Sequence, residues 1–473
     1  MRASTMSVDA TLISAFEDAL GTGHVFHEAA DLETYAEDGR GTRGEPALVV
    51  RPGSADEVRA ALAIAYAAGL RVVPQGARTG LVAAGLAETE GQDLVLSLER
   101  LKGSIAIDPV NRSARVGAGV LLSELNAAAA EHGLFFPIDL GADPSIGGMV
   151  AANTGGARLL RYGDVRQNLM GLELVTAEAD PRHLVLGSEL WKNNAALALQ
   201  DLVAGSSGAL GVVTAATLAL SPRPANTVTA LLALPEPETA LAILTRMEDA
   251  FGTLLTAFEG ISRPALSAAL AHVSSLRDPF AGAIPGYCVL LELSGGRAVP
   301  AEWLEEKLAE TLEPLFEDGT IADTRIDRST ALWAVRHAVP EGLRKSGRVV
   351  ACDIAMKRGD VMRFRGEIAQ TLAQIAPQLE LHDFGHIGDG GLHCNCVWPD
   401  NAGPYDAKVA EAAREAIFRT VVEDYRGSFS AEHGVGPANS AWYQRFTPSD
   451  VRDLSGRIQA LMAPMPLGRV NFG

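Results

Sequence analysis

The chain has 473 residues, of which 47% are hydrophobic and 21% charged, and its formal net charge at pH 7 is −18. This composition indicates a soluble globular protein that is too long for a single core, so two or three domains are expected. The strong negative charge argues against nucleic acid or an anionic membrane surface as a partner.

The first residues predict no targeting segment. Acidic residues at Asp9, Glu17 and Asp18 stand where a signal peptide would have an apolar run. No window of the sequence approaches the roughly 18 uninterrupted apolar residues of a membrane span. We therefore expect a cytoplasmic protein with no membrane span.

A β-α-β unit is predicted between residues 48 and 74. Residues 48–50 and the mainly apolar residues 70–74 are typical of strands, and the apolar helix expected at 58–67 separates them. Ser54 with Glu57 is typical of a capping box at the start of that helix, and Gly69 is placed to end it.

Three glycine-dense tracts lie within about 140 residues, at 75–80, 141–156 and 205–211. Free backbone N–H groups in such loops can bind phosphate oxygens, and the three tracts together suggest one extended ligand. The sequence Gly117-Ala118-Gly119 has Leu122 where the third glycine of a dinucleotide fingerprint should be, and no P-loop is present. The ligand is therefore not expected to bind as in a Rossmann fold or a P-loop.

The stretch 386–395 predicts a metal-binding hairpin. Asp389-Gly390 is a strong type I′ turn signal, and with these two residues as the loop His386 pairs directly with His393. Such pairs have Cβ atoms about 4.5–5.5 Å apart, which suits two nitrogens that bind one ion. Asn395 points to the same face. The alternative is a hairpin whose histidines simply pack in a partly polar core.

Two histidines do not complete a metal site, so a third ligand is required. The best candidates lie in the segment 430–436, where Glu432 and His433 stand side by side before a glycine-rich turn. An ordinary helix-capping loop is the alternative explanation of this segment.

The first half of the chain resembles the FAD-binding domain of the vanillyl-alcohol-oxidase superfamily, which is of the PCMH type. The resemblance extends from residue 38 to about 220 and is carried by these motifs: Val49-Val50-Arg51-Pro52, Val73-Pro74-Gln75-Gly76, Thr79-Gly80-Leu81-Val82, Asp139-Leu140-Gly141-Ala142, Ile146-Gly147-Gly148, Asn153-Thr154-Gly155-Gly156, Arg161-Tyr162-Gly163 and Gly208-Ala209-Leu210-Gly211. It implies an α+β fold and an extended FAD.

The second half is similar to FAD-linked D-2-hydroxy-acid dehydrogenases, the group of D-2-hydroxyglutarate and D-lactate dehydrogenases. The motifs around His386, His393, Asn395 and Glu432-His433 carry this similarity. It implies that a divalent metal, zinc first and manganese as the alternative, is bound by His386, His393 and Glu432. It also implies catalytic roles for His433 as the base, for Arg336 as the partner of the substrate carboxylate, and for Asn395.

The resemblance also implies the domain organisation and the flavin site. We expect an FAD-binding domain at 1–222, a cap domain at 223–429 with an antiparallel sheet, helices on one side and the metal hairpin, and a C-terminal segment at 430–473 that returns to the FAD domain. The loop at Gly76 offers no histidine for covalent attachment, so noncovalent FAD is expected. The expected FAD-binding residues are Pro74, Gly76, Ala77, Arg78, Thr79, Gly80, Gly141, Ser145, Gly148, Asn153, Thr154, Gly155, Gly205, Gly211, Val212, Val213 and Asn471.

The implied reaction is oxidation of a D-2-hydroxy acid to the 2-oxo acid, with hydride transfer from C2 to flavin N5 and with the metal as Lewis acid. Pro340 and Ala351 stand where relatives carry a threonine and a lysine for the far carboxylate of the substrate, and Asn439 stands where a lysine is common. We therefore expect a neutral or apolar substrate tail, with D-2-hydroxyglutarate as the alternative. Arg344, Lys345 and Arg348 are candidates for replacement charge.

Two other classes stay open. A flavin-free zinc hydrolase would share the metal ligands but leave the glycine tracts unexplained. A flavoprotein oxidase or electron-transfer subunit of the same superfamily would keep FAD and act on a different substrate or on none. The expected partners are a small 2-hydroxy acid and an electron acceptor such as an electron-transfer flavoprotein or a quinone, and a homodimer is kept open.

Overall fold

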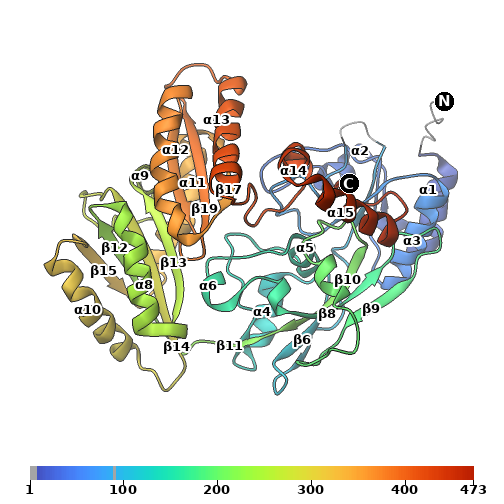
Figure 1. The fold of residues 1–473 in the computed structure, drawn as a ribbon. Coiled ribbons are helices and arrows are strands. Elements are labelled where there is room, and N and C mark those ends of the chain that lie inside the picture. The colour runs from blue at the N-terminus through green and yellow to red at the C-terminus, as the bar shows by residue number, and fades with distance from the viewer. Residues whose placement is uncertain (1–7, 89–91) are drawn as a thin grey trace. The chain divides into compact units, whose positions relative to one another are not determined.

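The computed structural model describes residues 8–88 and 92–473, which form an α+β fold in two compact units (Figure 1). Unit 1 consists of the described residues up to Gly155, with Asp164–Pro222 and Glu432–Gly473. Unit 2 consists of Gly156–Gly163 and Arg223–Ala431. None of the helices in the described ranges is both long and apolar enough to cross a membrane.

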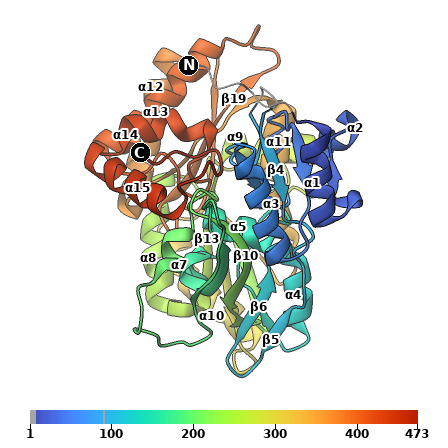
Figure 2. The same cartoon turned by 90° about the vertical axis from the view of Figure 1, so that its right-hand side faces the viewer.

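Unit 1 contains two principal sheets. A four-stranded sheet has the order β1-β2-β4-β3, and a five-stranded antiparallel sheet has the order β5-β6-β10-β8-β9, with β10 in its centre (Figure 2). The strands of these two sheets are β1 Val25–Phe26, β2 Leu48–Val50, β3 Val72–Gln75, β4 Leu94–Ser97, β5 Ala106–Asp108, β6 Ser113–Gly117, β8 Leu169–Val175, β9 His183–Gly187 and β10 Val212–Ala219. A separate pair of short strands in unit 1 consists of β7 Leu134–Phe135 and β11 Ser221–Pro222. The α-helices of unit 1 are α1 Ala10–Leu20, α2 Ala29–Leu32, α3 Ala55–Ala67, α4 Leu122–Ala130, α5 Ile146–Ala152, α7 Leu199–Val203, α14 Ser440–Phe446 and α15 Ser449–Met462.

The predicted β-α-β unit is confirmed as β2, α3 and β3. Ser54 caps α3, because its Oγ accepts a hydrogen bond from the backbone N–H of Glu57 at 3.1 Å. The Glu57 carboxylate accepts from the N–H of Gly53 rather than from that of Ser54, so the reciprocal bond is shifted by one residue. Gly69 follows the helix with a φ of 70°, a conformation that favours glycine.

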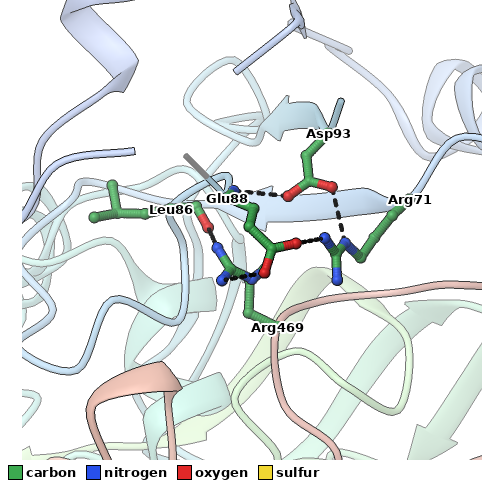
Figure 3. A network of polar contacts seen from close by, with 5 residues as sticks. All are labelled: Arg71, Leu86, Glu88, Asp93 and Arg469. Atoms are coloured by element: carbon green, nitrogen blue, oxygen red, sulfur yellow. Dashed lines mark hydrogen bonds and ion pairs between the residues drawn. The ribbon is translucent and has the colours of Figure 1, made fainter. Parts of the chain in front are cut away.

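The C-terminal tail of unit 1 pairs with β3. Leu467 forms a parallel bridge with Val72, and the N–H of Gly468 donates to the Val72 carbonyl at 2.8 Å. A polar network fixes the tail further along (Figure 3): Arg469 donates to the Leu86 carbonyl at 3.0 Å and lies 3.4 Å from the Glu88 carboxylate. Arg71 joins Glu88 to Asp93 in the same network. The last residues of the chain are therefore part of the folded unit.

Unit 2 is built on one antiparallel sheet with the order β15-β12-β14-β13-β18-β19-β16, in which β17 also pairs with β19. Its strands are β12 Asn226–Leu234, β13 Leu255–Ser262, β14 Tyr287–Gly295, β15 Asp323–Asp327, β16 Gly347–Val350, β17 Asp353–Ala355, β18 Glu380–Gly385 and β19 Gly391–Pro399. Its helices are α6 Leu159–Tyr162, α8 Ala240–Phe251, α9 Arg263–His272, α10 Ala301–Glu317, α11 Ala331–Ser346, α12 Val361–Ile375 and α13 Ala407–Arg419.

Helices cover both faces of this sheet, so the expectation of helices on one side is wrong. α9 and α11 pack against Leu231, Ala257 and Leu290 on one face, and α8 and α10 lie over the other (Figure 1). The physical reason is visible in the strands: every residue of β13 and β14 is buried. Strands that are buried on both faces need helices on both sides.

Candidate functional site

The three glycine tracts converge in unit 1. A methyl group on Gly76 would lie 2.3 Å from Oγ of Ser145, and one on Gly205 would lie 3.1 Å from Cβ of Asn153. One on Gly208 would contact Pro74 at 3.8 Å. Segments that are far apart in the sequence thus approach one another, most closely at Gly76 and Gly205, where an added methyl group would crowd its neighbour.

Polar groups in these tracts leave hydrogen-bonding capacity for a ligand. Gln75 Oε1, Ser145 Oγ and Ser206 Oγ are buried and have no hydrogen-bond partner among the described residues. Buried polar atoms without partners are costly, so these three atoms fit a polar ligand such as the diphosphate and ribityl part of FAD. Gly80 and Gly141 face open space, where an added methyl group would meet no atom within 4 Å.

Other predicted FAD-binding residues have structural roles of their own. Val212 and Val213 are buried in two hydrophobic cores, so their backbone is the part that can face a ligand. A methyl group on Gly211 would lie 2.6 Å from Leu174, so packing against that leucine already requires glycine. The Asn471 side chain accepts a hydrogen bond from the Gly473 N–H at 3.1 Å.

Several of the remaining tract residues adopt backbone conformations that are rare for residues with side chains. Arg78 has a φ of 60° and Asn153 a φ of 50°. The Arg78 guanidinium lies over the Tyr35 ring at 5.3 Å. Pro74 lies in β3, which ends at Gln75, and the loop residues Ala77 and Thr79 follow that strand. Gly148, Thr154 and Gly155 lie in α5 or directly after it.

The predicted register of the histidine hairpin is wrong. β18 pairs with β19 so that His393 stands opposite Phe384, and His386 lies beyond the strand end in a longer connection. The type I′ turn does not form, since Asp389 is not among the residues with positive φ. Instead the N–H of Gly388 donates to the Phe258 carbonyl of β13 at 3.1 Å, so the connection follows the neighbouring strand.

The two imidazoles are nevertheless neighbours, with ring centroids 5.1 Å apart. Nδ1 of His386 lies 2.8 Å from Oε1 of Glu259, a residue of β13 that is 1% exposed. A carboxylate can only accept a hydrogen bond, so Nδ1 carries the proton. Nε2 is then the ring nitrogen that would offer its lone pair to a metal ion, which is the usual arrangement of metal-binding histidines.

Glu259 also binds Arg336, the arginine expected to hold the substrate carboxylate. Nε of Arg336 donates to Oε2 of Glu259 at 2.7 Å, and the guanidinium lies over the Phe384 ring at 4.8 Å. The two terminal nitrogens of Arg336 make no hydrogen bond to a described residue. Burial raises the pKa of Glu259, but His386 and Arg336 outweigh it and lower the pKa to about 2. Glu259 is therefore a charged carboxylate.

Asp353 is a second carboxylate that the sequence reasoning missed. It begins β17, stands opposite His393 in the strand pair, and its Oδ1 lies 3.5 Å from Nδ1 of His393. The two side chains can offer ligand atoms to one ion. One feature of the sequence could have indicated both Asp353 and Glu259. Each is a single acidic residue in an apolar strand sequence, and such a residue needs a partner when it is buried.

Two further contacts lie next to Asp353 and His393 in unit 2. Oδ1 of Asn395 accepts from the Cys352 N–H at 3.1 Å, which holds the junction between β16 and β17. The N–H of Ala431 donates to the Asp353 carbonyl at 3.2 Å. Ala431 is the last residue of unit 2, and Glu432 and His433, which follow it in the chain, begin the last segment of unit 1.

The candidates for replacement charge are exposed. Lys345 pairs with Glu341 at 2.6 Å, and the Arg348 guanidinium lies over the Tyr405 ring at 4.4 Å. Arg344 lies in the last turn of α11. Pro340 lies inside α11, one turn after Arg336, and Ala351 lies between β16 and β17. Two of the three candidates therefore already have local partners.

A second buried ion pair lies on the same face of the sheet. The carboxylate of Glu292 in β14 accepts two hydrogen bonds from Arg158, at 2.8 and 2.9 Å, and one each from Trp333 and Thr256. Burial raises the pKa of Glu292, whereas these partners lower it to below its usual value. Arg158 belongs to the short segment Gly156–Gly163, which interrupts unit 1 and is part of unit 2.

Family comparisons agree with the two halves of the chain. A family model described as an FAD binding domain matches residues 46–184, and one described as the C-terminal domain of FAD linked oxidases matches residues 223–465. Among curated relatives, the D-2-hydroxyglutarate dehydrogenase of Xanthomonas citri pv. viticola is 35% identical over 86% of this chain and 85% of the relative. The D-2-hydroxyglutarate dehydrogenase of Stutzerimonas stutzeri is 32% identical over 90% of this chain and 91% of the relative.

Solved structures share the fold at low identity. p-Cresol methylhydroxylase with substrate bound aligns with a TM-score of 0.74 and 16% identity over 96% of this chain and 94% of its own. Alkyldihydroxyacetonephosphate synthase aligns with a TM-score of 0.71 and 14% identity over 98% of this chain and 85% of its own. At these identities the comparison shows the fold and nothing finer.

Proposed function

The chain belongs to the family of FAD-linked D-2-hydroxy-acid dehydrogenases, and from this premise we propose that it oxidises a D-2-hydroxy acid to the corresponding 2-oxo acid with the help of a divalent metal. It is an FAD-dependent oxidoreductase that acts on a CH–OH group. The observation that carries the metal-assisted reaction is the bridge made by Glu259, which holds a metal-binding imidazole and a guanidinium beside each other.

We propose that His386, His393 and Glu432 hold the metal, with Asp353 beside His393. Two imidazoles and a carboxylate are a donor set that suits zinc and also suits manganese. The fixed proton on Nδ1 of His386 and the carboxylate of Asp353 support this assignment. Glu432 enters the proposal because it follows Ala431, whose N–H is bound to Asp353.

In the proposed reaction the substrate loses a hydride from C2 and a proton from the 2-hydroxyl group. When bound, FAD accepts the hydride, and a divalent ion lowers the pKa of the hydroxyl group. Arg336 binds the carboxylate through its terminal nitrogens. His433 takes the hydroxyl proton as general base. Asn395 of β19 holds the junction between β16 and β17 through its bond to Cys352.

We expect the substrate to have a neutral or apolar tail. Pro340 and Ala351 have no charge to offer a second carboxylate, and Lys345 and Arg348 have local partners. A second carboxylate left unpaired in a closed site costs several kcal/mol. The names of the relatives favour D-2-hydroxyglutarate as the second candidate.

An anaerobic titration with D-2-hydroxy acids tests this function. D-Lactate and longer aliphatic or aromatic D-2-hydroxy acids are expected to bleach the flavin absorption, and the L-enantiomers are the control. The kcat/KM for the preferred monocarboxylate is expected to exceed that for D-2-hydroxyglutarate by roughly 10²-fold. A higher value for D-2-hydroxyglutarate would refute the tail assignment, and no bleaching by any D-2-hydroxy acid would refute the reaction.

We also propose that FAD is bound without a covalent link. The loop 76–80 contains no histidine, cysteine or tyrosine for attachment. Acid precipitation of the purified protein is therefore expected to leave all the yellow colour in the supernatant, measured by its absorption. Colour that stays in the pellet would show a covalent flavin. Reduced FAD then needs an acceptor, and an electron-transfer flavoprotein or a quinone in the cytoplasm is our proposal.

A further inference from the structure

Glu259 occupies a central place in unit 2. It lies in β13, between β14 and β18 in the sheet, and its side chain is on the face covered by α9 and α11. Its two carboxylate oxygens have different partners: Oε1 binds His386 from the connection after β18, and Oε2 binds Arg336 from α11. Three separate elements thus meet at one carboxylate.

The geometry sets two properties of the site at once. A carboxylate accepts from both partners, so it holds the proton of His386 on Nδ1 and leaves Nε2 as the ligand atom. The same group is rigid and planar, so the metal-binding imidazole and the guanidinium are held at a fixed separation. A 2-hydroxy acid presents its hydroxyl and carboxylate oxygens on adjacent carbons, and a fixed separation between their two partners suits that arrangement.

We propose that Glu259 is a positioning residue of the reaction, which selects the metal-binding tautomer of His386 and fixes Arg336 relative to it. This inference rests on the proposed function. It assigns to Glu259 no contact with substrate or metal.

Glutamine cannot replace Glu259, although it has nearly the same shape. Both His386 Nδ1 and Arg336 Nε donate, whereas a glutamine side chain offers one accepting oxygen and one donating NH₂ group. If its oxygen faces Arg336, its NH₂ group faces His386 and favours the tautomer with the proton on Nε2. That tautomer cannot bind metal through Nε2. If the amide is turned, two donors meet at Arg336 instead.

The affinity for zinc therefore measures the effect of Glu259 on His386 directly. In Glu259→Gln the dissociation constant for zinc, measured by chelator competition on the metal-free holoflavoprotein, is expected to rise about 10- to 100-fold. The flavin spectrum is expected to stay that of the wild type. At saturating zinc, the KM for a D-2-hydroxy acid is expected to remain about tenfold raised, because Arg336 has lost one hydrogen bond to a charged group.

Glu292→Gln is the matched control. Glu292 is also a buried carboxylate on the same sheet face with an arginine partner, but it is not bonded to His386 or Arg336. This variant is expected to keep wild-type zinc affinity. Equal loss of zinc in both variants would show a general effect of removing a buried charge and would overturn the positioning role.

The zinc-binding results distinguish a failure of the role proposed for Glu259 from a failure of the proposed metal-assisted reaction. A wild-type protein that binds no zinc or manganese would refute the metal-assisted function itself. A wild-type protein that binds zinc, with Glu259→Gln showing both the wild-type zinc affinity and the wild-type KM, would refute only the role of Glu259. If Glu259→Gln does not fold, Glu259→Asp is the variant to measure. It keeps the charge but withdraws both carboxylate oxygens from His386 and Arg336 by about one bond length, so its zinc affinity is also expected to fall. Wild-type zinc affinity in that variant would overturn the proposal.

Discussion

Replacement of His386, His393 or Glu432 by alanine is expected to lower turnover of D-2-hydroxy acids by roughly 10²–10³-fold or more, while the flavin absorption spectrum stays unchanged. The metal would no longer be held, so the 2-hydroxyl group would keep its ordinary, high pKa. The flavin spectrum should be spared because the proposed FAD site is formed by the glycine tracts. Steady-state kinetics with an artificial electron acceptor, together with metal analysis of each variant, provide the measurement.

Chelation should reproduce the effect in the wild type, and added zinc or manganese should restore activity. His382→Gln is a suitable control, since His382 is also a buried histidine but lies within β18, opposite Asn395 rather than beside His393. It is expected to retain turnover. Full activity in extensively chelated, metal-free enzyme would contradict the metal mechanism.

The second large effect concerns stability. Arg158→Met is expected to lower the free energy of unfolding of unit 2 by about 3 kcal/mol, at the low end for a broken buried ion pair because Arg158 is partly exposed. The loss arises because the Glu292 carboxylate, 2% exposed, would remain charged and buried without its principal partner. Thermal unfolding followed by circular dichroism measures the change at pH 7.

The pH dependence gives a check with a definite sign. The pKa of Glu292 is lowered in the folded protein, so its ion pair contributes stability above the unfolded pKa of about 4.3 and loses it as the pH falls through the lower folded value. The difference between wild type and Arg158→Met should therefore shrink below about pH 4. The double variant Arg158→Met with Glu292→Leu should recover much of the stability, and no recovery would contradict an ion-pair origin.

Local sequence signals predicted local structure well. Ser54 and Gly69 delimit α3 as expected, because capping and helix termination depend on residues within one turn. The α+β class followed from the resemblance of both halves. Whether helices cover one face or both faces of the sheet in unit 2 was harder to predict. The apolar sequences of β13 and β14 indicate that the strands are buried, but not which elements cover them.

The histidine site was partly predictable. His386 and His393 do come together, but through a five-residue connection whose path depends on a bond between Gly388 and Phe258. The prediction used only residues 386–395, so it could not include Phe258, which lies 130 positions before Gly388 in the chain. Glu259 and Asp353 were missed for the same reason: each stands alone in its own strand, and only the sheet order brings it to a histidine.

The pairing of the tail with β3 has a consequence for how the protein is made. Val72 is synthesised almost four hundred residues before its partner Leu467. Throughout that interval the outer edge of β3 has no segment beside it, and Glu88 lacks the cation of Arg469. Unit 1 therefore cannot reach its native state during translation of its own first half, and a nascent chain with an open sheet edge is a natural substrate for chaperones.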